Sequence, residues 1–309
     1  MQVYLPIAGI SINALLLLAM GAGVGFLSGL FGVGGGFLVT PLLTFTGIPS
    51  AVAVATGANQ VVASSVSGAL AQWRRGNVDF KLGFVLMAGG IFGAIIGVRI
   101  VKLVSELGQI DFFINISYVV LLGIVGSLML AESVRTILQT RAGKPPQGRR
   151  SGQHGFVLGL PFKMRFPRSK LYMSVIPPLA LGAFIGLLSG IMGVGGGFIM
   201  VPALIYLLRV PTSVVFGTSL FQTVFVAGTT TILQATQNRS VDAVLAFLLI
   251  IGGVVGAQFG VRAAQRLKAE QLRFLLAALV LAVALRLAYQ LVVSPNELFS
   301  IAEIRAQLP

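Results

Sequence analysis

Two glycine-rich runs carry the residues of this chain that could do chemistry. Residues 25–41 read GFLSGLFGVGGGFLVTP and residues 186–202 read GLLSGIMGVGGGFIMVP, so the same run recurs after 161 residues. Consecutive glycines break a helix and allow close approach to the backbone, because they carry no Cβ atom. If a helix begins after each run, free N–H groups lie at its N-terminus, which carries roughly half a positive charge and binds anions. The runs therefore predict an anion-binding site built from backbone.

Neither run fits the nucleotide-binding motifs that glycines often signal. A phosphate-binding loop requires Lys followed by Ser or Thr, whereas Phe37 and Phe198 follow the glycines here. A dinucleotide-binding fingerprint requires a preceding strand and a different glycine spacing. The remaining alternative is close helix packing, although glycines that pack helices are usually spaced by four residues.

Uncharged polar residues near the two runs complete the predicted site. Amide side chains can donate hydrogen bonds to an oxyanion without adding charge, and they are costly in hydrocarbon unless they face protein or water. Hydrogen bonding between helices is the alternative role for these side chains. The predicted substrate-binding residues are Gly34, Gly35, Gly36, Gly195, Gly196, Gly197, Ser28, Ser189, Thr56, Asn59, Gln60, Thr218, Ser219 and Gln222.

Charged residues at the segment ends have simpler expected roles. Asp79 and Asp242 each begin an apolar segment, where capping of a helix N-terminus is the expected role. Arg99 and Arg262 close the same segments, where they either guide an anion or extend to the lipid headgroups.

The chain lacks the residue clusters that enzymes and metal sites require. It has no cysteine, one histidine and eight Asp and Glu residues. No cluster of His, Cys or carboxylates is therefore expected to bind a metal, activate a nucleophile or hold a redox cofactor. We expect neither enzyme activity nor a cofactor.

The composition places the chain in a membrane. The chain is 56% hydrophobic and 10% charged, with a mean hydropathy of +0.95, whereas soluble domains are about 25% charged. The net charge of +14 would suit nucleic acid, but basic cytoplasmic loops of a membrane protein give the same excess. We expect a lipid bilayer as partner and no nucleic acid.

Each half of the chain contains five apolar segments. They are residues 10–31, 33–48, 51–73, 80–103 and 111–131, then 174–192, 194–208, 213–236, 242–264 and 271–293. The second segment of each half is short for a full span, which indicates a half-helix or a broken helix. The predicted units are a first transmembrane repeat at 1–134, a basic solvated linker at 135–170 and a second repeat at 171–309.

Five crossings in each half would invert the second half relative to the first. If the linker is cytoplasmic, 17 of the 22 Lys and Arg residues lie inside and five lie outside, as the positive-inside rule requires, and both termini lie outside. Re-entrant glycine hairpins, which would change the number of spans, are an open alternative. The predicted fold is an all-α polytopic membrane protein of two inverted repeats, with glycine-rich broken helices near the midplane.

The doubled motif G-x-x-S-G-x-x-G-V-G-G-G-F resembles that of the TauE/SafE sulfite-exporter family, and the resemblance covers nearly the whole chain except the linker. It implies a membrane transporter of sulfite, sulfoacetate or a related organosulfur anion. We therefore expect an exporter of such an anion in the cytoplasmic (inner) membrane. The alternative functions are an anion channel and a membrane scaffold or receptor that does not transport.

Overall fold

Ten α-helices are present in the part of the chain that the structure describes, and each falls on one of the predicted apolar segments. The computed structural model describes residues 2–31, 34–141, 161–169, 171–208, 210–264 and 269–292. The helices of the first half are α1 (Ala14–Phe31), α2 (Gly36–Phe45), α3 (Ser50–Arg74), α4 (Phe80–Glu106) and α5 (Ile110–Arg141). Those of the second half are α6 (Ile176–Met192), α7 (Gly197–Tyr206), α8 (Thr212–Leu233), α9 (Ala243–Ala264) and α10 (Ala269–Val292), with a π-helical turn, η1 (Gln234–Asn238), after α8.

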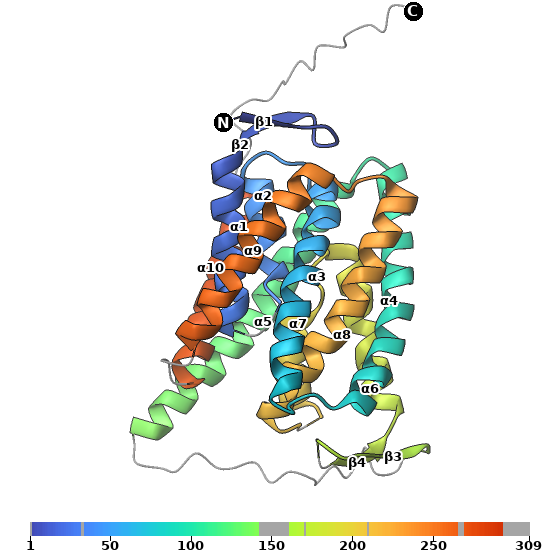
Figure 1. Ribbon diagram of the computed structural model, residues 1–309, viewed down its shortest axis with the longest axis vertical. Helices are drawn as coiled ribbons and strands as arrows, with labels where there is room; N and C mark the ends of the chain where they lie inside the picture. Colours follow the sequence, from blue (N-terminus) through green and yellow to red (C-terminus); the bar gives the residue numbers. More distant parts are fainter. Residues whose placement is uncertain are drawn as a thin grey trace, which may run out of the picture.

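A small antiparallel β-hairpin precedes the first helix of each half. The first hairpin pairs β1 (Gln2–Leu5) with β2 (Ile10–Asn13), and the second pairs β3 (Lys163–Phe166) with β4 (Leu171–Ser174). The two hairpins lie at opposite ends of the molecule (Figure 1). Because β3 begins 161 residues after β1, the hairpin belongs to the duplicated unit.

The hairpins correct three sequence predictions. Residues 10–13 form a strand and are not the start of a membrane segment. Within the linker predicted at 135–170, α5 continues to Arg141 and β3 forms a strand in which Phe166 is fully buried. Residue 171, the predicted start of the second unit, lies in the second strand of this hairpin, whose first strand begins at Lys163. Residues 142–160 of the linker lie outside the described residues.

Six helices are long and apolar enough to cross a membrane, so the protein is a multi-pass membrane protein. They are α1, α4, α5, α8 with its extension, α9 and α10. The other four apolar segments do not meet this standard. Helix α3 has 25 residues, but its Thr, Asn, Gln and Ser side chains lower its hydropathy, and α6 has 17 residues. Helices α2 and α7 have ten residues each, which confirms that the second segment of each half is a short helix.

Glycines spaced by four residues let two helix pairs approach closely. Helix α1 packs against α9, and α4 packs against α6. A Cβ atom added to Gly25 would lie 2.1 Å from the carbonyl oxygen of Gly253, so only glycine fits there. Small residues at such crossings are typical of membrane helices. The glycines that meet a partner backbone in this way are Gly21, Gly25, Gly29, Gly89, Gly93, Gly97, Gly182, Gly186, Gly190, Gly252, Gly256 and Gly260.

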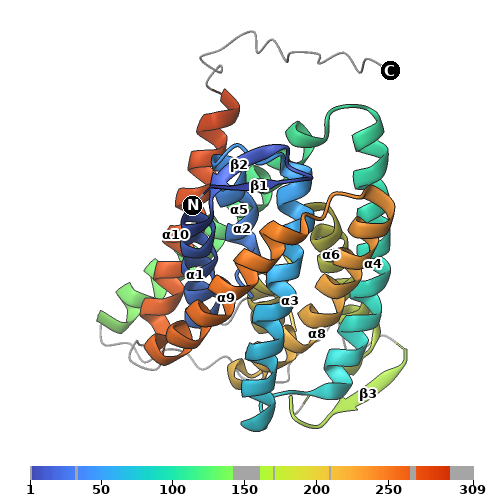
Figure 2. The ribbon, with the colours of Figure 1, turned by 45° about the horizontal axis from the view of Figure 1, so that its top comes forward.

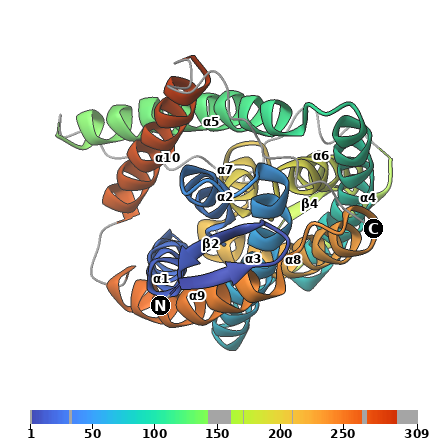
Figure 3. The ribbon, with the colours of Figure 1, turned by 90° about the horizontal axis from the view of Figure 1, so that it is seen from above.

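The two halves are interwoven. The first helix of each half packs against the fourth helix of the other, while α3 packs against α8 and α5 packs against α10. Figure 3 shows α2 and α7 in the middle of the helices, with α5 and α10 on one side and α3 and α8 on the other. Figures 2 and 3 show the β1–β2 hairpin lying across one end of the bundle, from α1 towards α3.

Asp79 caps α4, as predicted, and also joins the two halves. Its Oδ1 atom accepts a hydrogen bond from the N–H of Leu82 at 3.3 Å. Its Oδ2 atom accepts two more from the β3–β4 hairpin of the other half, from the backbone N–H of Ser169 at 2.9 Å and from its hydroxyl at 2.8 Å. The backbone N–H of Asp79 donates to the hydroxyl of Thr218 on α8 at 3.1 Å. This buried carboxylate therefore fixes the second hairpin to the start of α4.

Asp242 makes the equivalent contacts at the start of α9. Its Oδ1 atom accepts hydrogen bonds from Val244 and Leu245, each at 3.1 Å, so its predicted capping role is also confirmed. Its Oδ2 atom accepts from the backbone N–H of Ile7 in the β1–β2 turn at 3.0 Å, and its own N–H donates to the hydroxyl of Thr56 at 3.1 Å. Each hairpin is thus held by an aspartate of the opposite half.

Replacing Asp79 by Ala should destabilise the protein strongly. The change removes a helix cap, worth about 1 kcal/mol, and hydrogen bonds to a charged group, worth about 1.5–3 kcal/mol. We expect the free energy of unfolding in detergent to fall by about 2–5 kcal/mol, measured by chemical denaturation. Glu106→Ala, at the exposed C-terminal end of the same helix, is the control and should be close to neutral. Equal stability of the two variants would show that the carboxylate does not join the halves.

Candidate functional site

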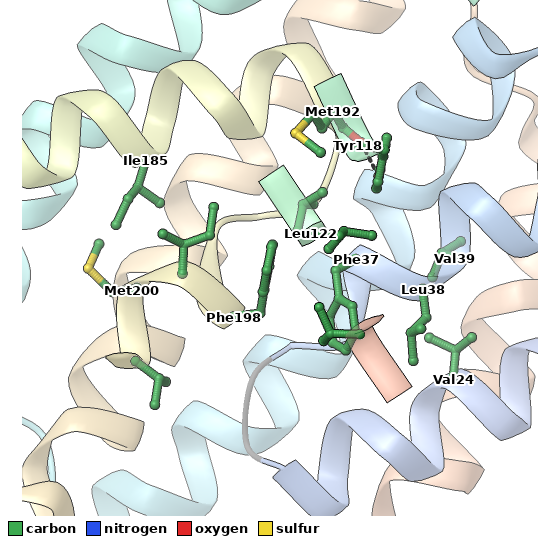
Figure 4. Close-up of a cluster of buried hydrophobic side chains, with 14 of the residues drawn as sticks. Val24, Phe37, Leu38, Val39, Tyr118, Leu122, Ile185, Met192, Phe198 and Met200 are labelled. Carbon is green, nitrogen blue, oxygen red and sulfur yellow. Dashed lines mark hydrogen bonds between the residues drawn. The ribbon is translucent and has the colours of Figure 1, made fainter. Parts of the chain in front are cut away.

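The two short helices begin at the glycine runs, and their N-termini face each other. The residue before each helix is a glycine with a left-handed backbone, Gly35 with φ 67° and Gly196 with φ 74°. Residues with a Cβ atom rarely adopt this conformation. The rings of Phe37 and Phe198, in the first turn of each helix, lie 5.1 Å apart between centroids (Figure 4). The consecutive glycines therefore start two half-helices at one place, as the sequence predicts.

The two loops and the helices α3 and α8 meet at one point. A Cβ atom added to Gly36 would lie 2.5 Å from the carbonyl oxygen of Val194 in the other loop. A Cβ atom added to Gly195 would lie 2.4 Å from Cγ1 of Val61 and 2.9 Å from Cγ2 of Thr223. We call this region the glycine junction. It consists of residues 34–36, residues 194–197, Val61, Ser65 and Thr223.

Several backbone donors at the glycine junction have no acceptor among the described residues. In the described part of the chain, no protein acceptor is found for the N–H groups of Gly36 and Phe37 at the start of α2, nor for those of Gly197 and Phe198 at the start of α7. The first N–H groups of a helix have no partner within the helix. Two helix N-termini thus direct their positive ends to one place, which is favourable for an anion.

Two hydroxyls that were not predicted from the sequence lie at the glycine junction. The Oγ atom of Ser65 lies 3.2 Å from the position that a Cβ atom on Gly34 would take, and the neighbouring Ser64 hydroxyl donates to the Gly34 carbonyl at 3.2 Å. Ser65 and Thr223 are both fully buried, and neither hydroxyl has a hydrogen-bond partner among the residues that the structure describes. An unsatisfied buried polar group costs about 1–3 kcal/mol, so these hydroxyls are candidates for binding a ligand.

The two predicted glutamines lie beside the helix crossings next to the glycine junction. Gln60 donates from Nε2 to the carbonyl oxygen of Gly21 on α1 at 3.1 Å, and its Oε1 atom has no partner. Gln222 lies against Gly90 of α4 and is fully buried, and within the described ranges neither its Nε2 nor its Oε1 atom has a partner. The free donor is therefore the amide of Gln222.

The remaining predicted polar residues have partners in their own helices or at the aspartate caps. Thr56 and Thr218 accept hydrogen bonds from the backbone N–H groups of Asp242 and Asp79. Asn59 donates to the carbonyl oxygen of Ala55, and Ser219 donates to that of Phe216. None of these four contacts is with the glycine junction.

The two predicted serines lie on α1 and α6, the helices that precede the two glycine loops. The Cβ atom of Ser28 lies 2.7 Å from the position that a Cβ atom on Gly35 would take. Ser189 is fully buried, and its hydroxyl has no partner. Tyr118 of α5 donates to the carbonyl oxygen of Met192 at 2.7 Å and fixes the end of α6 beside this loop (Figure 4).

Comparison with known proteins identifies the family. The family model described as "Sulfite exporter TauE/SafE" matches residues 17–287. A "Probable membrane transporter protein" of Xylella fastidiosa (strain 9a5c) is 32% identical over 276 residues, covering 87% of this chain and 94% of the relative. The "Probable membrane transporter protein YjnA" of Bacillus subtilis is 28% identical over 271 residues, covering 88% and 98%. No solved structure gives a significant match.

The family match covers both glycine runs and all ten helices except the ends of α1 and α10. The relatives are membrane transporters and not enzymes, and they align over nearly their full lengths. The chain is therefore a member of the TauE/SafE sulfite exporter family of membrane transporters.

Proposed function

We propose that this protein exports a small sulfur-containing anion, such as sulfite, sulfoacetate or another sulfonate, and that the anion binds at the glycine junction. The observation that carries this proposal is the meeting of two helix N-termini with free N–H groups beside buried polar groups that have no partner. An oxyanion supplies acceptors to such donors. The family supplies the chemical class of the anion.

The uncharged character of the site suits transport. The glycine junction consists of glycines, two valines and two residues with hydroxyls, so an anion there meets partial charges and no fixed cation. A deeply buried Arg or Lys would be costly to desolvate and would hold an anion too tightly for release. The inside-negative membrane potential favours efflux by ~2.3 kcal/mol per charge per 100 mV.

The two halves act as inverted repeats in the cytoplasmic membrane. Five helices per half and hairpins at opposite ends support this arrangement. The guanidinium of Arg168 in the β3–β4 hairpin donates to the carbonyl oxygen of Gly76 at 2.8 Å, so the α3–α4 loop and the second hairpin share one end. We assign this end, with the basic linker, to the cytoplasm, and both termini to the outside.

Reporter fusions test this topology. Phosphatase and fluorescent reporters inserted after residues 76 and 150 should report the cytoplasm, and reporters after residue 239 and at the C-terminus should report the outside. The loop at residue 76 contacts the β3–β4 hairpin, and the loop at residue 239 leads to Asp242, which binds the β1–β2 hairpin. The four positions therefore sample both ends of the molecule. A cytoplasmic C-terminus together with a cytoplasmic linker would exclude the inverted arrangement.

Replacing Gly34 by Ala should abolish anion binding, because the new methyl group enters the glycine junction beside Ser65. Gly34 has φ +85°, so the change also strains the backbone by about 1–2 kcal/mol. Gly47→Ala is the matched control, since Gly47 has φ +87° and nothing lies within 4 Å of an added Cβ atom. Binding of sulfite and sulfoacetate is measured by thermal shift and calorimetry on purified protein.

We expect both variants to lose similar stability, and only Gly34→Ala to lose affinity. Equal affinity in the two variants would place the anion elsewhere.

The two glutamines should contribute unequally to binding. Gln222→Leu removes a free amide donor, whereas the Gln60 donor already binds Gly21. Loss of a hydrogen bond to a charged group is worth ~1.5–3 kcal/mol, so Gln222→Leu should weaken sulfonate binding by roughly ten- to 150-fold. Gln60→Leu should have a smaller effect. Parent-like affinities in both variants would leave the glutamines with a role in helix packing alone.

A further inference from the structure

The two β-hairpins are alike on their apolar face and differ on their outer face. The buried apolar residues of the second hairpin, Phe166, Leu171 and Met173, stand 161 residues after Leu5, Ile10 and Ile12 of the first. The outer face of the second hairpin carries Lys163 and Arg165, both exposed, where the first hairpin carries Gln2 and Tyr4. Packing against the helices explains the apolar face in both copies. It does not explain a positive outer face in only one of them.

The turn between α3 and α4 extends this positive surface. Its side chains Arg74, Arg75 and Lys81 are exposed. The guanidinium of Arg168, in the turn of the second hairpin, donates to the carbonyl oxygen of Gly76 at 2.8 Å, so the hairpin and the α3–α4 turn lie together (Figure 1). We call this surface the basic patch. It consists of Arg74, Arg75, Lys81, Lys163, Arg165 and Arg168.

The segments that form the basic patch are almost free of acidic residues. Residues 72–84 and 161–174 have Asp79 as their one acidic residue, and Asp79 is buried and hydrogen-bonded to the hairpin. The equivalent segments at the opposite end of the molecule, residues 2–13 and 234–247, have Arg239 as their one basic residue. The basic patch is therefore a feature of one end, and the duplicated fold does not require it.

A row of aromatic rings leads from the basic patch along α4 and α8. The indole of Trp73 meets the ring of Phe80 edge to face, with 5.9 Å between the centroids. Phe80 and Phe84 meet the ring of Phe221 in the same way, at 5.3 and 5.5 Å. The ring of Phe225 lies 5.1 Å beyond that of Phe221. Trp73 is 59% exposed and Phe84 is 52% exposed, and both helices are membrane-span candidates, so the row faces lipid from the interface inwards.

We propose that the basic patch and the row of rings form one binding site for an anionic phospholipid. The lipid phosphate lies among the Arg and Lys side chains of the patch, and an acyl chain lies along the rings from Trp73 towards Phe225. Arginine binds phosphate through two parallel hydrogen bonds, and each basic side chain near a membrane surface adds about fivefold to the affinity for anionic lipid. A soluble phosphate or a nucleic acid would use the patch alone and leave the rings without a role. This site is separate from the glycine junction and does not depend on which anion is transported.

Trp73 is the only tryptophan of the chain, so its fluorescence reports directly on the lipid at this site. Purified protein is reconstituted in vesicles of phosphatidylglycerol and phosphatidylcholine, in which one lipid or the other carries brominated acyl chains that quench tryptophan. Comparison of the two quenching curves gives the preference of the site for the anionic lipid. We expect the parent to prefer phosphatidylglycerol by about fivefold or more. Equal quenching by the two lipids would overturn the inference.

Arg75→Gln/Lys81→Gln removes two exposed charges of the basic patch and leaves the rings in place, so it should lower this preference about fivefold. The matched control is Lys102→Gln/Arg239→Asn, which removes two exposed charges at the opposite end of the molecule. Asn suits residue 239 because its backbone is left-handed, with φ 49°. The control should keep the preference of the parent. An equal fall in both variants would show general attraction between charges, an unchanged preference in the patch variant would place the lipid elsewhere, and either result overturns the inference.

Should Arg75→Gln/Lys81→Gln not fold, Lys163→Gln/Arg165→Gln on the outer face of the hairpin decides in the same assay, by the same criteria. Glycerol 3-phosphate at millimolar concentration should leave the quenching unchanged, because it lacks the acyl chains that lie on the rings. Loss of the preference in its presence would make the basic patch a site for a soluble phosphate and overturn the assignment to a lipid.

Discussion

Close contact between backbones, which is possible only where a Cβ atom is absent, determines how the helices of this protein are arranged. Lipid tails are as apolar as leucine, so hydrophobic burial does little to bring membrane helices together, and tight packing must do so. The contacts of Gly25 with Gly253 on α9 and of Gly186 with Gly90 on α4 draw the first helix of each half against the other half. The same absence of side chains lets the two glycine loops meet between α3 and α8. Helix packing and the candidate site therefore depend on one physical constraint.

Broken helices are costly inside a bilayer, because the freed backbone groups must find partners away from water. The broken backbone at the glycine junction is surrounded by protein. The N–H groups of Gly197 and Phe198 have no acceptor there in the described part of the protein. Under the proposed function, a bound anion gives these groups a partner, and its departure removes that partner. The proposed site would then bind its ligand through groups that the fold cannot satisfy by itself, which is compatible with both binding and release.

The ten helices could be predicted from the sequence because each apolar segment must be long enough for the membrane or end at a glycine run. The hairpins could not, since strands of four residues give no clear periodic pattern and the burial of Phe166 is decided by tertiary packing. The glycine part of the candidate site was visible in the sequence, and the polar residues predicted with it on α3 stay a prediction. Thr56 and Gln60 contact the other half and α1. Val61, the residue after Gln60, and Ser65, one turn further on, face the loops. Adjacent side chains on a helix point in directions about 100° apart. Polar residues occur at contacts between helices as well as at ligand sites, so their pattern alone does not identify the face that meets a ligand.

The central claim, that an anion occupies the glycine junction, can be measured directly because the chain has no cysteine. Ser65→Cys introduces a single thiol beside Gly34. A small sulfonate-bearing methanethiosulfonate reagent converts this thiol to a mixed disulfide and releases methanesulfinate, and the rate of this labelling is followed in proteoliposomes with and without methanesulfonate or ethanesulfonate, which do not react with the reagent. Ser105→Cys, at the exposed end of α4, serves as the reference site. We expect the anion to slow labelling at residue 65 in a concentration-dependent manner and to leave labelling at residue 105 unchanged. Labelling at residue 65 that is unaffected by either anion, or that never occurs, would contradict binding at the glycine junction.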